Sequence, residues 1–235
     1  MGPLPIQQIV IGTSDEARTR EFWALFGYLD RDGRLESGRG ARLVLRESSE
    51  RGPERGAWDL GPRGLDIYVH DLDRALARLA DAGVVGGPVA DISIGPVRMR
   101  QCAVLGPSAE PVVLVESTHR RPSLLDEGAW CSEVYSVVWC VPSREVAMTE
   151  LLEAGASAGV PMSFSDPSLG PYLSLPEAEA TLEMVTMADD AGASTRLELL
   201  SFPGRQHSEV RGRSGVTAIV FADGSEWSVS TEGAR

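Results

Sequence analysis

The hydrophobic and polar residues of the chain follow one pattern three times. A short apolar run leads into an amphipathic stretch that closes on a glycine, in residues 6–27, 65–83 and 135–155. The last position of each run lies fourteen residues before the closing glycine, as Thr13 does before Gly27. This repeated spacing indicates one supersecondary unit used three times.

Each amphipathic stretch carries the signals of an α-helix. It begins at a side chain that caps helices: Ser14 or Asp15 in the first, Asp71 in the second and Ser143 in the third. Apolar stripes at helical spacing follow, made of Phe22, Leu25 and Phe26, of Leu72, Leu76 and Leu79, and of Ala147, Leu151 and Ala154. Because the closing glycine favours the left-handed conformation that ends helices, we predict three short helices.

Strand-like runs, and no second helix, follow each predicted helix. They are residues 42–47 and 57–60 after the first, 97–105 and 112–116 after the second, and 172–175, 181–187 and 196–202 after the third. The repeated unit is therefore β-α-β-β-β. A further strand, residues 215–221, has no helix behind it.

Serial units of this kind resemble the vicinal oxygen chelate superfamily, which includes glyoxalases, extradiol dioxygenases and bleomycin-resistance proteins. The resemblance rests on residues 6–26, 69–83, 100–116 and 197–204. It implies an α+β fold in which βαβββ modules form cup-shaped mixed sheets, two modules to a cup. In the family a divalent metal at the bottom of the cup is held by His, Gln or Glu from first strands and by Glu from last strands.

The resemblance also implies a domain organisation. We expect a first domain of two modules over residues 1–117 (about 4–62 and 64–117), a linker over 118–132, and a second domain over 133–235 with one module (133–204) and the strand 215–221. The third module then lacks a partner. Either strand 215–221 supplies a truncated fourth module, or the third module pairs with its copy in a second chain, which predicts a homodimer.

Few metal ligands occupy the positions that the resemblance assigns to them. These positions are Gln8 in the first module, Gly64 and Val113 in the second, and Ser136 and Glu198 in the third. One or two ligands per cup are too few for a stable divalent site, so we expect neither a metal nor another cofactor. With the strands shifted by one residue, Glu198, Gln8 or Glu116 would be ligands instead, and the protein would be metal-dependent.

The strand around residue 66 carries the candidate catalytic groups. Asp66, Tyr68 and His70 alternate with apolar residues, so they share one face, which we expect to line the cup. A desolvated Asp66 would be a general base, with Tyr68 or His70 stabilising negative charge on an oxygen. The alternatives are a solvated or capping His70 and a tyrosine packed in the core.

Five further residues are candidates for binding the substrate. Arg98 and Arg100 share one strand face and would hold a carboxylate or phenolate if that face lines the cup; otherwise they are a solvated face. Gln8 would hydrogen-bond a ligand, Glu198 is a second candidate base or a strand residue paired with a neighbour, and Trp139 offers a flat surface or belongs to the core.

Composition and charge remove several other classes of function. The chain has 235 residues, and its 22 basic residues, all arginine, face 34 acidic ones for a net charge of −12. Without lysine there is no Schiff-base chemistry and no Walker-type phosphate loop, and an acidic chain is a poor partner for nucleic acid or anionic membrane. No apolar run is long enough to span a membrane, no signal peptide is recognisable, and the three cysteines lack metal or redox spacing. We therefore expect a cytoplasmic protein.

The leading hypothesis is a metal-independent enzyme of the isomerase, cyclase or lyase type. It would act by acid–base chemistry on a small, aromatic or polyketide-like molecule of secondary metabolism, in antibiotic biosynthesis or resistance. One alternative is a non-catalytic protein that binds a drug or metabolite, as in bleomycin resistance. The other is a metal-dependent enzyme of the glyoxalase or dioxygenase type.

Overall fold

The three repeated units are present in the structure, a computed structural model that describes residues 4–38, 40–48, 58–118, 128–176, 180–188, 195–209 and 214–229. The first unit comprises β1 (Ile6–Thr13), α1 (Glu16–Ala24), β2 (Leu29–Arg31), β3 (Arg34–Glu36) and β4 (Arg42–Glu47). The second comprises β5 (Asp59–Val69), α2 (Leu72–Asp81), β6 (Gly86–Ile94), β7 (Val97–Leu105) and β8 (Pro111–Ser117). The α+β fold of βαβββ modules is confirmed.

The third unit is longer, and short strands follow it. It comprises β9 (Cys131–Cys140), α3 (Arg144–Glu153), β10 (Ser157–Ala158), β11 (Met162–Phe164), α4 (Leu169–Leu173), β12 (Leu182–Ala188) and β13 (Arg196–Ser201). After it come β14 (Ser208–Glu209), β15 (Gly215–Phe221) and β16 (Glu226–Ser228). The prediction of a strand at residues 172–175 was wrong, because Tyr172 belongs to the helical turn α4. A turn precedes α4, in which the Asp166 carboxylate accepts a hydrogen bond from the Ser168 amide.

The capping signals act as the sequence predicts. Asp15, Asp71 and Ser143 each accept a hydrogen bond from a backbone amide three residues on, so they satisfy a donor that the first helical turn leaves free. Gly83 follows α2 with φ +79°, a conformation that other residues adopt only with strain. Local sequence thus determines where these helices begin and end.

Two sheets divide the strands, and the modules pair in an unexpected way. One sheet has the order β16-β15-β1-β4-β3-β2, and the other β10-β12-β13-β9-β5-β8-β7-β6. β5 pairs antiparallel with β9, so the cup joins the second and third modules, whereas the first and second were expected to pair. The reason is that β15 occupies the edge of β1, which leaves β5 free for β9. The unpartnered third module that motivated the expectation of a homodimer is therefore absent from this arrangement.

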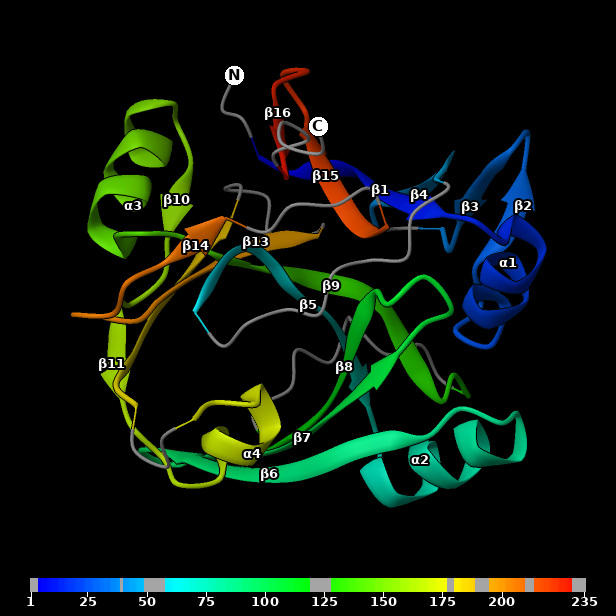
Figure 1. The fold of residues 1–235 in the computed structure, drawn as a ribbon, viewed down its shortest axis with the longest axis horizontal. Helices are drawn as coiled ribbons and strands as arrows, with labels where there is room; N and C mark the ends of the chain where they lie inside the picture. The colour runs from blue at the N-terminus through cyan, green and yellow to red at the C-terminus, as the bar shows by residue number, and fades with distance from the viewer. Residues whose placement is uncertain are drawn as a thin grey trace.

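The larger sheet curves around the space that becomes the site. Figure 1 shows it bending from β11 and β13, through β9 and β5, to β8, β7 and β6, with α4 beside β6 and with α2 and α3 outside the curve. The main core lies between the sheets and the helices; its largest fully buried side chains include Trp23, Tyr28 and Leu65. Thr195 links the two sheets, because its hydroxyl donates to the Val134 carbonyl and accepts from the Ala41 amide, both at 2.8 Å.

The three cysteines are buried and free. Burial raises the pKa of the Cys131 thiol to about 12 and that of the Cys140 thiol to about 11. Such thiols stay protonated and pack as small apolar groups. Among the described residues, no helix is long and apolar enough to cross a membrane.

Candidate functional site

An internal pseudo-two-fold axis relates the two halves of the cup. Leu65 of β5 faces Val137 of β9 across the antiparallel pair, so the axis passes between them. Gly64, one residue before Leu65, therefore corresponds to Ser136, one residue before Val137. Because Asp66 pairs with Val113 and Val138 pairs with Glu198, Val113 corresponds to Glu198. The floor of the cup is therefore built from equivalent positions that carry different side chains.

A cavity of about 290 Å³ lies above this floor. Its polar lining comes mainly from Arg63, Asp66, Tyr68, Gln101, Ser117, Tyr135, Tyr172, Thr186, Arg196 and Glu198. Its apolar lining comes from the floor, the curved edges and α4: Ile92, Ile94, Val97, Met99, Val113, Val138, Met162, Phe164, Leu169, Leu173, Leu182, Met184 and Leu200. A mostly apolar cavity with a few convergent polar groups is typical of a site for a small organic molecule.

Asp66 and Glu198 form a carboxyl pair at the floor. Asp66 is 5% exposed, whereas Glu198 keeps some accessible surface because it lines the cavity. Burial raises the pKa of Asp66 well above its usual range, and the Glu198 charge raises it further while Arg196 opposes the shift. Burial also raises the pKa of Glu198, to about 7, against the effects of Arg196 and the Ser136 hydroxyl. Near neutral pH, the pair therefore tends to retain a proton.

Arg196 lies on the same row of the sheet as Asp66. Ser136 pairs with both residues, from β9 between them, so all three side chains project to one face. The Arg196 guanidinium stands 5.4 Å from the centre of the Tyr135 ring. Tyr135 in turn stacks on Tyr68, with ring centres 3.9 Å apart and planes at 7°. The strands thus position a cation, two phenols and two carboxyls around one cavity.

The residues at the floor do not fit a divalent metal ion. Of the four equivalent positions where the family resemblance expects ligands, only Glu198 supplies a carboxylate. Gly64 supplies no side chain, and a Cβ there would lie 2.8 Å from Cγ2 of Val113, whose methyl group fills the space. In the part of the chain that the structure describes, no three His, Cys, Asp or Glu side chains gather to hold a metal.

Five of the eight predicted site residues lie outside the cavity lining: His70, Gln8, Trp139, Arg98 and Arg100. His70 is exposed at the end of the strand that carries Asp66 and Tyr68, outside the cavity lining. Gln8 belongs to the other sheet, where it pairs with Arg42. Trp139 is buried on the far side of β9, edge-on to Trp227. Asp66, Tyr68 and Glu198 are the predicted residues that the structure brings together.

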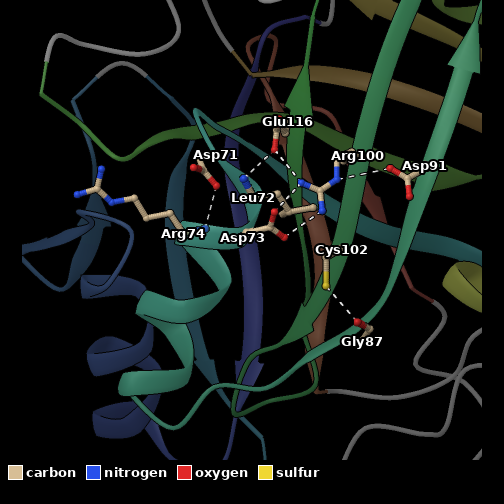
Figure 2. Close-up of polar contacts among 9 residues, drawn as sticks. All are labelled: Asp71, Leu72, Asp73, Arg74, Gly87, Asp91, Arg100, Cys102 and Glu116. Carbon is tan, nitrogen blue, oxygen red and sulfur yellow. Dashed lines mark hydrogen bonds and ion pairs between the residues drawn. The ribbon is translucent and has the colours of Figure 1, made fainter.

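Arg98 and Arg100 lie on the outer face of β7, because Val97, Met99 and Gln101 line the cavity instead. Figure 2 shows Arg100 beside Asp73, Asp91 and Glu116 near the start of α2. Glu116 also accepts a 2.8 Å bond from the Leu72 amide there. Arg98 is exposed and donates to the Gly95 carbonyl. Both arginines therefore form the solvated face that the alternating pattern allowed.

Sequence reasoning missed Arg63, Tyr172 and a ligand-facing role for Arg196. Arg63 reaches the cavity through a register shift in β5 between Pro62 and Gly64, and its guanidinium approaches the Leu173 carbonyl of α4 at 3.4 Å. Tyr172 comes from α4, which packs against β6 of the other module. Alternation in β13 already placed Arg196 on the face of Glu198, and this was the one available signal.

Comparison with known proteins establishes the fold. No protein-family model and no curated protein sequence matches the chain. Among solved structures, two mutants of glyoxalase I from Zea mays superpose with TM-scores of 0.63 and 0.58, at 15% and 16% identity. They cover 91% and 86% of this chain, and 72% and 69% of their own.

A mutant of 4-hydroxymandelate synthase from Streptomyces coelicolor is also similar. Its TM-score is 0.50 at 12% identity, over 85% of this chain and 71% of that chain. At this level of identity the similarities show a shared arrangement of modules. They do not assign chemistry to the cavity, which depends on its own side chains.

Proposed function

The chain has the fold of the vicinal oxygen chelate superfamily, and on that premise we propose that it is an enzyme that moves protons within a small organic molecule without a metal. The observation that carries the proposal is the Asp66–Glu198 carboxyl pair at the floor of a mostly apolar cavity. Because the buried pair tends to retain one proton near neutral pH, one carboxyl can act as an acid and the other as a base.

The two carboxyls come from β5 and β13, the strands that flank β9 in the sheet. The register places β5 and β13 on either side of that strand, roughly 10 Å apart at the backbone by the usual spacing of strands. A ligand above β9 therefore meets one carboxyl from each side. The ionised carboxyl removes a proton from one position of the ligand, and the protonated carboxyl delivers one to another. This arrangement supports isomerisation or elimination.

Solvent exchange tests the proposal. Small cyclic ketones such as 2-indanone and 2-tetralone, incubated with the protein in D₂O, should gain deuterium beside the carbonyl faster than in buffer. Asp66→Asn or Glu198→Gln should slow this exchange by about 10²–10⁴-fold, the usual contribution of general acid–base catalysis. Asp91→Asn, which changes an exposed carboxyl on the outer face, is the matched control.

Binding of the ketones is followed separately by NMR line broadening. If ketones that bind exchange no faster with the wild type than with the double variant Asp66→Asn/Glu198→Gln, proton transfer in this cavity is refuted. Non-catalytic binding is the second candidate function, favoured by the apolar lining and the stacked Tyr68–Tyr135 pair. It would leave binding intact in both single variants and show no exchange in any protein.

A further inference from the structure

Arg196 is a cation that has no hydrogen-bond partner among the residues that the structure describes. Within the described part of the chain, its guanidinium makes no ion pair and no side-chain hydrogen bond; it is held over the Tyr135 ring. It lies close enough to Asp66 and Glu198 to lower the pKa of both carboxyls. A guanidinium has five N–H donors, and Arg196 belongs to the cavity lining, so a ligand in the cavity can accept from them.

The surroundings of Arg196 favour a negatively charged oxygen. The neighbouring carboxyls tend to hold a proton, so they do not fully neutralise the cation. Burial raises the pKa of Tyr68 and Tyr135, so both hydroxyls stay protonated. The Tyr135 hydroxyl donates to that of Tyr68, so the Tyr68 proton is the one that a ligand can accept. The wall formed by β6, β7 and β8 is mainly apolar, with Ile92 and Met99 among its side chains, and it also carries Gln101 and Ser117. A ligand suited to this cavity presents one oxygen to Arg196 and an apolar ring to the wall.

We propose that Arg196 binds the oxygen of an enol or phenol as its anion, and that the substrates are therefore carbonyl compounds that enolise. The inference rests on the proposed function, because the enolate is the species that proton removal forms. When a carboxylate takes the proton beside the carbonyl, the C–H electron pair forms the C=C bond. The carbonyl π pair then moves to the oxygen that faces Arg196. Return of a proton to carbon reverses both shifts, and no oxidant or reductant is needed.

The probe for this site is 4-nitrophenol, whose neutral and ionised forms absorb at different wavelengths. Titration with the wild-type protein at several pH values should show that the phenolate binds preferentially, so that the bound probe ionises at lower pH than the free one. In Arg196→Met, which keeps an unbranched apolar stem but removes the guanidinium, affinity for the phenolate should fall by about ten- to hundredfold. Affinity for nitrobenzene, which cannot ionise, should stay the same.

Two variants serve as controls. Arg196→Lys should recover part of the preference for the phenolate, because it restores the charge without the planar fork. Arg100→Met, on the outer face, should change nothing. Circular dichroism and Tm show whether each variant is folded.

The outcomes separate the two proposals. Binding of 4-nitrophenol in its neutral form, or unchanged phenolate affinity in folded Arg196→Met, overturns the role of Arg196. Binding of nitrobenzene without the phenolate does the same and leaves the proton-transfer function standing. Failure of both probes, together with failure of the cyclic ketones to bind, overturns the proposed function as well.

Discussion

Glu110 makes the stability of the protein depend on pH, through a carboxyl far from the cavity. Its side chain is fully buried, with one oxygen accepting a 2.8 Å hydrogen bond from the Ser108 amide. It lies against the tight turn at Gly106, where an added Cβ would lie 2.2 Å from the carboxyl. Burial raises the pKa of Glu110 from 4.5 to about 7, against smaller opposing effects of hydrogen bonds.

The raised pKa of Glu110 determines how the stability of the protein changes with pH. The folded state holds the proton more tightly than the unfolded state, so the contribution to stability is fully present below pH 4.5 and is lost as pH rises through about 7. At ~1.4 kcal/mol per pH unit, a rise from 4.5 to about 7 corresponds to about 3.5 kcal/mol. Glu110→Gln carries no ionisable group and should not show this loss.

Urea unfolding of the wild type and of Glu110→Gln, from pH 5 to 8.5, measures the effect. The free energy of unfolding of the variant, relative to the wild type, should rise by about 2.5 kcal/mol across this range, because the first part of the change occurs below pH 5. The new amide can also change the free energy of unfolding by the same amount at every pH. Such a constant change does not affect the test, because the two proteins are compared by how their stability depends on pH. Glu153→Gln, at an exposed position of α3, is the control and should follow the wild type. A Glu110→Gln difference that stays constant with pH, within the error of the extrapolation, would refute the reasoning.

Two further predictions concern packing at the floor and the junction between the sheets. Gly64→Ala places a Cβ 2.8 Å from Val113 Cγ2 and should lower the free energy of unfolding by about 1–3 kcal/mol. In urea titrations, the double variant Gly64→Ala/Val113→Ala should lose less stability than the two single variants together, because the smaller alanine side chain in place of the valine removes the clash. Losses that simply add would contradict the clash. Thr195→Val leaves the buried Ala41 amide without its acceptor and should cost about 1–3 kcal/mol. Thr195→Ser keeps the hydroxyl and should retain most of the stability in thermal melts. A large loss in Thr195→Ser with little loss in Thr195→Val would mean that the methyl group matters and the hydrogen bond does not.

Local features of the chain could be predicted because neighbouring residues determine them. Asp15, Asp71 and Ser143 cap the helices by bonding an amide three residues away, whatever the rest of the chain does. Alternation along β5 places Asp66 and Tyr68 on one face by the period of a strand. The short edge strands and α4 escaped prediction because their few residues carry little periodic signal.

The pairing of modules was beyond local reasoning. β1, β5 and β9 begin equivalent units, and each exposes the same main-chain hydrogen-bonding groups at its edge, so the sequence hardly distinguishes one pairing from another. β15, far along the chain, takes the edge of β1, and β5 then meets β9. This pairing brings Glu198 and Arg196 to the cavity that holds Asp66.

The sequence by itself determined the repeated units, the limits of their helices and the face on which each strand residue lies, because these depend on contacts within a few residues. Only the tertiary structure decided which faces meet: it turned Arg98 and Arg100 to the outside and placed a carboxyl pair and Arg196 around one cavity. The physical reason is that backbone hydrogen bonds join strands without regard to side chains. The composition of the cavity therefore follows from packing across the whole chain.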